Sequence, residues 1–552
     1  MMARTVADEI VNMLVKCGVE RIYGIPGDSI DPLMDAIRRN QKIQYVQTRH
    51  EEGAALEAAF EAKVTGLPVA CMGTSGPGSI HLLNGLYEAK MDHVPVIALT
   101  GQVETDLIGS DYFQEINVNH LFEDVSVYSQ QINSSENAAY LTWRAYMEAR
   151  NKRGVSHLTL PVDILRMEVK GDFNYFFIND LKPVYTVAPE TAQNLINHSN
   201  RPLIFIGRGA IGQGGRIIEL AENIGAPVIY ALNAKGIVAD SDERVLGGLG
   251  LLGSKPSVVA MEKCDLIIFL GTSYPYKAFI NDDVKTIQVD LNPENIGKRF
   301  HVSVPYVSSV SDFLDAVKPS EKTEKFYRQL QPIKREWTDK LIKEEESDSK
   351  PIRPERVVAT LSKMVNEDAI IVVDTGNVTV WGMRNFRTSS SRTFLFSPWL
   401  GSMGVGIPGS IGASFGTNKP VVALVGDGSF AMTMMELTTA RKYNRPVKII
   451  VFNNSKLGMI KFEQEVMGYP EWGVDLMNPD FSKIAEAVGI TGIRVEDPLK
   501  LDESMKMFLG AEGPAVLDVV VDPDARPMPP ELTFKEVKGY ITSMFREKLG
   551  SL

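Results

Sequence analysis

The stretch Val421–Asn454 constrains the fold of this chain most, because it predicts two parallel strands joined by a helix. Val421–Val425 and Val447–Phe452 are short apolar runs, and Ala431–Asn444 between them carries apolar residues at helical spacing. Two parallel strands with one crossover helix lie side by side or nearly so. The residues that follow each strand therefore meet at one edge of a sheet, which is where open α/β sheets bind ligands.

Polar residues stand at both of these strand ends. Gly426-Asp427-Gly428 follows the first strand, and Asn453-Asn454 follows the second. Glycines allow the backbone to approach an anion at the start of the next helix. Asp427, Asn454 and a nearby backbone carbonyl offer oxygen ligands that suit Mg²⁺. The same residue types form ordinary turns and caps, but both motifs at matching strand ends favour a metal and phosphate site.

Composition narrows the class of protein. The chain has 552 residues, of which 23% are charged and 44% hydrophobic, and its formal net charge is −11. This charge argues against nucleic acid as the main partner, since no basic surplus offsets phosphate repulsion. Cys17, Cys71 and Cys264 are far apart in apolar contexts, which indicates core thiols in a reducing, cytoplasmic compartment. No apolar run approaches the about 20 residues of a transmembrane helix, and the acidic N-terminus does not resemble a signal peptide.

Strands and helices alternate along most of the chain, which predicts an α/β fold of three doubly wound parallel-sheet domains. We predict these domains at 1–178, 188–320 and 351–525, with a charged linker at 321–350 and a Pro-rich tail at 526–552. Asn179–Val187 is predicted to link the first two domains, and Thr533–Lys548 to form an amphipathic helix in the tail. In the first domain we predict helices at Thr5–Lys16, Ser29–Arg39, Glu51–Val64 and Ser79–Lys90, and strands at Arg21–Gly24, Gln44–Thr48, Pro68–Met72 and Pro95–Thr100.

Glu51 opens a predicted helix directly after a strand. A lone carboxylate at this position usually caps the first turn, where the helix dipole favours it. However, the next strand ends in Gly73-Thr74-Ser75-Gly76-Pro77-Gly78, a second loop suited to close backbone approach. Glu51 and this loop are therefore expected on the same edge of the first sheet.

The second domain carries Gly207-Arg208-Gly209-Ala210-Ile211-Gly212 after a strand, which fits the dinucleotide pattern G-x-G-x-x-G. The acidic residue expected about 20 positions further on to bind a ribose is missing, because Ala231-Leu232-Asn233 stands there. Nicotinamide binding is therefore disfavoured. Gly271–Tyr276 and Asp290–Pro293 follow later strands, so these loops form either a surface for a long nucleotide or ordinary turns.

The third domain contains two more loops of this kind. Asp374-Thr375-Gly376 ends the predicted strand Ile370–Val373, and Gly401-Ser402-Met403-Gly404-Val405-Gly406 follows a short apolar stretch. A methionine between small residues is usually core filler.

Four motifs in this order, RHEEGAA, GTSGPG, GSMGVGIP and GDGSF…NN, resemble the thiamine-diphosphate enzymes of the pyruvate oxidase and acetolactate synthase group. The resemblance covers essentially the whole chain and implies pyrimidine-binding, central FAD-binding and diphosphate-binding domains. Within the group, residues 109–115, 153–164, 271–279, 289–299 and 452–463 resemble bacterial pyruvate oxidases most.

The resemblance implies roles for individual residues. Glu51 matches the acid that binds the pyrimidine nitrogen N1′, and Met403 the apolar wedge that bends the cofactor. Asp427, Asn454 and the carbonyl of Lys456 match the Mg²⁺ ligands. The remaining thiamine-diphosphate contacts are Gly376, Ser402, Gly426, Gly428, Ser429 and Ile460, and the implied FAD contacts are Gly207, Arg208, Gly209, Thr272, Tyr274, Tyr276, Asp290 and Asn292. The family's site forms between the first domain of one chain and the third domain of another, so a homodimer or homotetramer is implied.

The implied reaction is oxidative decarboxylation of pyruvate through a hydroxyethyl-thiamine diphosphate intermediate. Oxidases pass the electrons to FAD and then to quinone or O₂, and they release CO₂ and acetate or acetyl phosphate. Phe113, Gln114 and Glu463 resemble the oxidases, whereas acetolactate synthases carry Trp in place of Glu463. The alternatives are a synthase-like carboligase that joins two 2-oxo acids, and a thiamine- or nucleotide-binding module without catalysis.

The chain departs from the family pattern in two places. Val307-Ser308-Ser309 stands where relatives have Gly-Asp or Ala-Asp near the flavin, which favours the synthase alternative if FAD is absent or structural. The quinone-reducing, membrane-activated oxidase extends further at its C-terminus into a lipid-binding helix. We expect Thr533–Lys548 to pack on the protein, and a weak contact with the inner membrane face is the alternative.

Overall fold

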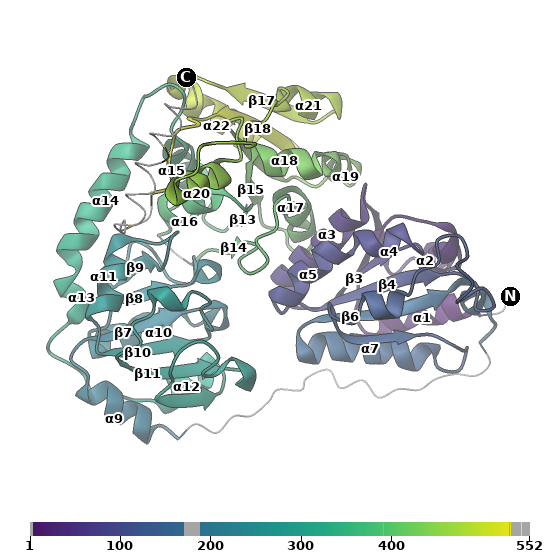
Figure 1. Ribbon diagram of the computed structural model, residues 1–552, viewed down its shortest axis with the longest axis horizontal. Coiled ribbons are helices and arrows are strands. Elements are labelled where there is room, and N and C mark those ends of the chain that lie inside the picture. Colours follow the sequence, from purple (N-terminus) through teal and green to yellow (C-terminus); the bar gives the residue numbers. More distant parts are fainter. Residues whose placement is uncertain (1–3, 170–187, 390, 529, 531–542, 544–552) are drawn as a thin grey trace.

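The computed structural model describes residues 4–169, 188–389, 391–528, 530 and 543. It contains three six-stranded sheets in which all pairings between named strands are parallel, with helices packed against them (Figure 1). This confirms the predicted fold class. In the described ranges, no helix is long and apolar enough to cross a membrane. The predicted linker Asn179–Val187 and, apart from Ser543, the predicted helix Thr533–Lys548 lie outside the described residues.

The first sheet has the strand order β2-β1-β3-β4-β6-β5. Its strands are β1 (Arg21–Gly24), β2 (Gln44–Gln47), β3 (Val69–Gly73), β4 (Val96–Gln102), β5 (Ser126–Gln131) and β6 (Val155–Pro161). The helices around it include α1 (Val6–Lys16), α2 (Asp31–Asn40), α3 (Glu51–Thr65), α4 (Pro77–His81), α5 (Leu83–Met91) and α7 (Ala138–Lys152). All of β3, β4 and β6 is buried, as expected for central parallel strands with helices on both faces.

The second sheet has the order β12-β11-β10-β7-β8-β9. It comprises β7 (Pro202–Ile206), β8 (Val228–Tyr230), β9 (Val245–Gly248), β10 (Leu266–Leu270), β11 (Lys285–Asp290) and β12 (Val304–Val307). Helices α9 (Glu190–His198), α10 (Gly214–Ile224), α11 (Lys255–Lys263) and α12 (Val310–Ala316) accompany it. The segment 321–350, predicted as a charged linker, forms α13 (Phe326–Gln329) and α14 (Gln331–Glu345), which bury Phe326, Trp337 and Leu341.

The third sheet has the order β14-β13-β15-β16-β18-β17. Its strands are β13 (Ile370–Val373), β14 (Phe394–Leu395), β15 (Val421–Gly426), β16 (Lys448–Asn453), β17 (Thr491–Val495) and β18 (Ala515–Val520). Its helices include α15 (Pro354–Met364), α16 (Asn377–Asn385), α17 (Gly406–Phe415), α20 (Gly458–Met467), α21 (Phe481–Ala487) and α22 (Leu501–Gly510). Strands β15 and β16 pair directly, from Val422 with Lys448 to Gly426 with Phe452, so the predicted side-by-side arrangement is confirmed.

Two predicted helices are broken in the structure. The helix predicted at Ala431–Asn444 begins earlier, at Asp427, and divides into α18 (Asp427–Thr433), the 3₁₀ turn η6 (Met434–Glu436) and α19 (Leu437–Lys442). The helix predicted at Ser79–Lys90 divides into α4 and α5 at Leu82. In both cases apolar spacing continued through the break, so the pattern did not reveal it.

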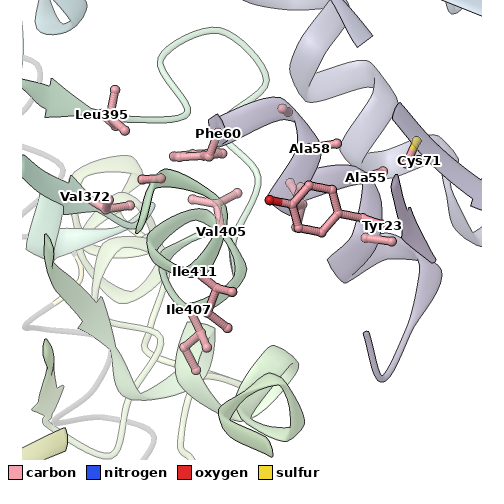
Figure 2. Close-up of a cluster of buried hydrophobic side chains, with 14 of the residues drawn as sticks. Tyr23, Ala55, Ala58, Phe60, Cys71, Val372, Leu395, Val405, Ile407 and Ile411 are labelled. Carbon is pink, nitrogen blue, oxygen red and sulfur yellow. The ribbon is translucent and has the colours of Figure 1, made fainter. Parts of the chain in front are cut away.

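The first and third domains share one hydrophobic core between α3 and α17 (Figure 2). Phe60 extends from α3 towards Val405 of the third domain. The helices approach closely because glycines face α3: a Cβ on Gly412 would lie 2.0 Å from the carbonyl oxygen of Glu57, and one on Gly409 would lie 2.7 Å from the Phe60 ring. Small residues thus permit a backbone-to-backbone contact between two domains.

Glu57 is a charged residue type in this apolar interface. Its side chain is 0% exposed, and neither carboxylate oxygen has a hydrogen-bond partner among the described residues. Burial, together with the nearby carboxylates Glu436 and Glu61, raises the pKa of Glu57 well above its ordinary value. Burial in the folded protein therefore favours the neutral form of this side chain.

We expect the free energy of unfolding to decrease as the pH rises, because ionisation of Glu57 is less favourable in the folded protein than in the unfolded chain. Because its pKa is higher in the folded state, the stability contributed by neutral Glu57 is complete below the unfolded pKa, about 4.3. It falls by up to about 1.4 kcal/mol per pH unit above that value. Glu57→Gln should therefore raise the thermal midpoint relative to wild type at pH 8 and not at pH 4, measured at one scan rate.

Glu20→Gln serves as the control for this comparison, because the Glu20 side chain is largely exposed. Its difference from wild type should be small at both pH values. If the difference in thermal midpoint between Glu57→Gln and wild type is the same at pH 4 and pH 8, this expectation is contradicted.

Candidate functional site

Asp427 begins α18 directly after β15 and is almost completely buried. Its Oδ1 accepts a hydrogen bond from the Gly428 N–H (2.8 Å). Its Oδ2 accepts from the N–H groups of Asn454 (3.1 Å) and Ser455 (2.6 Å) and from Asn478 Nδ2 (2.8 Å). Burial raises the pKa of this carboxyl. The strand ends of β15 and β16 thus meet at one fixed carboxylate.

Asn454 and Lys456 follow β16 in a tight turn around Asp427. The Asn454 side-chain oxygen accepts from the Lys456 N–H at 3.0 Å, and Ser455 between them has a left-handed φ of 57°. The Lys456 ammonium instead pairs with Asp475 (2.7 Å) and Glu471. The structure therefore brings Asp427, Asn454 and Lys456 together at one turn, and carboxylate, amide and carbonyl oxygens are the ligands that fit Mg²⁺.

Three helix starts surround this turn. A Cβ on Gly458, the first residue of α20, would lie 2.5 Å from Asn377 Nδ2 and 3.0 Å from Asn454 Nδ2, so the starts of α16 and α20 are adjacent. Asn377 Oδ1 is buried with no hydrogen-bond partner in the described part of the chain. Cβ atoms added at Gly376 and Gly426 would meet no atom within 4 Å. Helix N-termini and open space at the glycines fit a diphosphate.

The loop that carries Ser402 and Met403 is tied to this edge by Asp374. The Asp374 carboxylate accepts from the N–H groups of Thr375 (2.7 Å), Gly404 (3.0 Å) and Gly406 (2.7 Å), and burial raises its pKa to about 6. Met403 Cε would lie 3.4 Å from a Cβ on Gly428, which places Met403 over the Gly426–Ser429 turn.

The other predicted third-domain residues lie around the same loops. Ser429 Oγ donates to the carbonyl of Thr375 at 3.4 Å. Ser402 Oγ accepts from Asn84 Nδ2 of the first domain at 2.9 Å. Ile460 and Glu463 are three residues apart on α20, so they share a face, and both are exposed.

A second cluster lies at the edge of the first sheet. Glu51 opens α3 and is 7% exposed. His81 Nδ1 lies 3.0 Å from Glu51 Oε2, the His50 ring stacks on His81 with centroids 4.4 Å apart, and a Cβ on Gly78 would lie 3.3 Å from Glu51 Oε1. The predicted proximity of Glu51 and the Gly73–Gly78 loop is therefore confirmed. Sequence reasoning missed His81, which lies at the end of the short helix α4 that follows the glycine-rich loop.

Gln114 and Phe113 adjoin this cluster. Ser75 Oγ lies 3.5 Å from Gln114 Oε1, and a Cβ on Gly76 would lie 2.9 Å from the Gln114 carbonyl oxygen. Gln114 has a left-handed φ of 62°, and the preceding Phe113 is 73% exposed. Among the described residues, no hydrogen bond or ion pair joins Glu51 to the Asp427 group.

The second domain presents its predicted loops side by side. A Cβ on Gly207 would lie 2.3 Å from the Gly271 carbonyl oxygen, and one on Gly209 would lie 2.7 Å from Gly271 Cα. Thr272 is buried at the same contact. Arg208 Nη1 donates to the carbonyl of Asp92 at 3.2 Å, so this loop also contacts the first domain.

The remaining residues predicted for FAD differ in exposure. Tyr274 is buried, and its hydroxyl donates to the Leu249 carbonyl at 3.1 Å, whereas Tyr276 is 56% exposed. Asp290 Oδ1 accepts from the Asn292 N–H (2.9 Å) and Asn295 Nδ2 (3.2 Å). Of the two tyrosines, only Tyr276 is exposed at this edge.

The departure at Val307-Ser308-Ser309 has a structural explanation. Ser309 Oγ accepts from the Asp312 N–H at 3.0 Å and so caps α12, and Ser308 is buried. Serine is a strong N-cap residue. The two serines therefore start a helix at a position where they offer no carboxylate.

Three α/β domains, with oxygen ligands and helix starts grouped at one edge of the third and a buried glutamate on the first, are consistent with a thiamine-diphosphate-binding protein. Family models confirm this: residues 4–121 match the N-terminal thiamine pyrophosphate (the same cofactor) binding domain, 190–317 the central domain, and 374–519 the C-terminal binding domain. The chain belongs to the thiamine pyrophosphate enzyme family.

Curated relatives match along nearly their whole length. The YdaP protein of Bacillus subtilis strain 168, described only as thiamine pyrophosphate-containing, is 38% identical over 98% of this chain and 96% of its own. A pyruvate oxidase of Lactiplantibacillus plantarum is 33% identical over 95% of this chain and 89% of its own, and an acetolactate synthase of Mycobacterium avium is 31% identical over 95% and 89%. The relatives therefore include proteins named for each of the two reactions, pyruvate oxidation and acetolactate synthesis.

We expect Gly458→Ala to weaken thiamine-diphosphate binding without unfolding the chain. The added methyl would push Asn377 and Asn454 from their positions, and shifts of this size around a metal site typically cost about 10–100-fold in affinity. Cofactor titration followed by protein fluorescence would measure the loss. Gly510→Ala, at the end of α22, is the matched control because its Cβ would meet no atom within 4 Å. Equal affinity in the two variants would contradict this interpretation of the site.

Proposed function

We propose that this protein is a Mg²⁺-, thiamine-diphosphate- and FAD-dependent pyruvate oxidase that releases CO₂ and acetate or acetyl phosphate. The observation that carries the proposal is the two-strand edge formed by Asp427, Asn454 and Lys456, with Glu463 on the helix that leaves it. The edge supports a thiamine-diphosphate enzyme, and Glu463 favours the oxidase over the synthase. Thiamine diphosphate, when bound, would accept the electron pair left by decarboxylation.

The residues of the third domain would hold the anionic end of the cofactor. Asp427, Asn454 and the Lys456 carbonyl would bind Mg²⁺, and the starts of α16, α18 and α20 would direct N–H groups at the phosphates. Met403, fixed over Gly428 through the Asp374 loop, would press against the middle of the cofactor.

The residues of the first domain would act at the reactive end. Glu51, buried and in contact with His81, would hold a proton against a ring nitrogen. Phe113 and Gln114, with Glu463 from the third domain, would line the pyruvate pocket and exclude water from it.

The central domain would hold FAD at the joined loops of Gly207–Gly209 and Gly271–Thr272. Exposed apolar side chains at this edge support a nucleotide surface; they are Ile211, Tyr276, Leu291 and Val307. Electrons would leave to a quinone or O₂.

The two halves of the site would meet across two chains. Exposed apolar side chains lie beside the third-domain half (Met432, Met435, Ile460 and Met467) and beside the first-domain half (Ile80, Tyr112 and Phe113). Burial of such patches drives association, so we propose at least a homodimer. Three free cysteines and the absence of a membrane-spanning helix in the described ranges support our proposal of a cytoplasmic protein.

An acetolactate-synthase-like carboligase is the second candidate, favoured by the helix-capping role of Ser309. A module without catalysis is disfavoured because Glu51, Asp427 and Asn454 are all present.

An anaerobic absorption spectrum of the purified protein tests the oxidase proposal. We expect a flavin band that bleaches when pyruvate is added, because electrons then have no external acceptor. A protein without flavin that forms acetolactate would overturn the oxidase proposal in favour of the carboligase. If the protein carries no flavin and forms no product from pyruvate, the result would support the non-catalytic module.

We predict that Glu51→Gln lowers turnover by at least about 100-fold while cofactor affinity changes little, because among the described residues no hydrogen bond or ion pair joins Glu51 to the phosphate-binding edge. Steady-state kinetics and a cofactor titration would separate the two effects. Glu52→Gln is the matched control, since Glu52 is the next residue and, within the described part of the chain, its Oε1 bonds only to Asn84 Nδ2 (2.6 Å). Near-wild-type turnover of Glu51→Gln would remove Glu51 from this role.

A further inference from the structure

Glu436, at the end of η6 in the third domain, contacts the two residues that immediately precede Glu51. Its Oε1 accepts hydrogen bonds from the backbone N–H groups of Arg49 (3.0 Å) and His50 (3.1 Å), and its Oε2 lies 3.2 Å from the Arg49 nitrogen. These bonds join chain segments 386 and 387 residues apart. A carboxylate from one domain therefore binds the backbone at the start of α3 in another.

The structure holds this carboxylate in one orientation. Glu436 is 2% exposed, and Thr439 Oγ donates to its Oε2 at 2.5 Å. A Cβ on Gly53 would lie 2.4 Å from Glu436 Oε1, so the carboxylate occupies the space left by a glycine in the first turn of α3. Hydrogen bonds to a charged acceptor in a buried site are among the stronger ones.

Further bonds from α19 act on the strand that leads to Glu51. The Tyr443 hydroxyl accepts from the Gln47 N–H at 2.7 Å, and Lys442 Nζ donates to Gln47 Oε1 at 2.6 Å. The backbone from Gln47 to His50 is thus bound to the third domain next to the residue that would activate the cofactor.

We propose that Glu436 is a positioning residue for Glu51: it fixes the first turn of α3 so that the Glu51 carboxyl is held in its working place. This inference rests on the role proposed for Glu51. The competing explanation is that Glu436 only strengthens the domain interface.

Glu436→Gln tests the inference because the amide keeps the size of the side chain but replaces one acceptor with a donor. Hydrogen exchange, measured by mass spectrometry on the cofactor-free chain, should accelerate by at least about tenfold at residues 49–53. Turnover should fall by about 10–100-fold while the affinity for thiamine diphosphate changes little.

Two further variants complete the test: one is a control for general loss of stability, and the other disturbs the Glu436 contact in a second way. Glu355→Gln removes a buried carboxylate of α15 that pairs with Arg353 inside the third domain (2.7 Å), so it should lower stability without faster exchange at 49–53. Gly53→Ala should reproduce the effects of Glu436→Gln by displacing the carboxylate, and it stands in if Glu436→Gln fails to fold.

Unchanged exchange at residues 49–53, or a loss of turnover equal to that of Glu355→Gln, would overturn the positioning role. The exchange measurement needs no reaction. Faster exchange with unchanged turnover in both Glu436→Gln and Glu51→Gln would therefore show that the proposed role of Glu51, and not the contact, is wrong.

Discussion

The close approach of α3 and α17 is the contact on which the relation between the first and third domains depends. Gly409 and Gly412 bring the backbone of α17 against Phe60 and Glu57. A larger side chain at either glycine would separate the helices and open the core that both domains share. The placement of α3 against the third domain therefore depends on a contact made in the middle of the helix, whereas Glu436 binds the backbone at its start.

The carboxylates at this interface affect stability differently because their hydrogen-bond partners differ. Glu436 has N–H and O–H donors on both oxygens, so burial strengthens its bonds. Glu61 bonds to Arg21 (2.7 Å) and Tyr23 (2.5 Å). Glu57, near both of them, has no donor in the described part of the chain, and the same low dielectric favours its neutral form. One helix face therefore carries a strong anchor at its start and a destabilising group one to two turns later.

Much of the fold could be predicted from the sequence because parallel strands buried on both faces leave continuous apolar runs. β1 and β13 were predicted with their observed bounds, and the pairing of β15 with β16 followed from one crossover helix. The division of Ala431–Asn444 at η6 could not be predicted, because it depends on Glu436 turning towards another domain. Likewise, the segment 321–350 is rich in charged residues, which predicts exposure. The burial of Trp337 depends on contacts with residues distant in the sequence.

The site shows the same division between local and non-local causes. Asp427 and Asn454 could be placed together from the sequence, because strand ends of one sheet meet at one edge. His81 could not be connected with Glu51 in this way, since it reaches Glu51 from the end of a separate short helix. Glu436 gave no signal, because its contacts are with backbone N–H groups that every residue carries. Residues that act on a site through backbone contacts leave no residue-type pattern, so they must be found from the geometry around a residue already implicated.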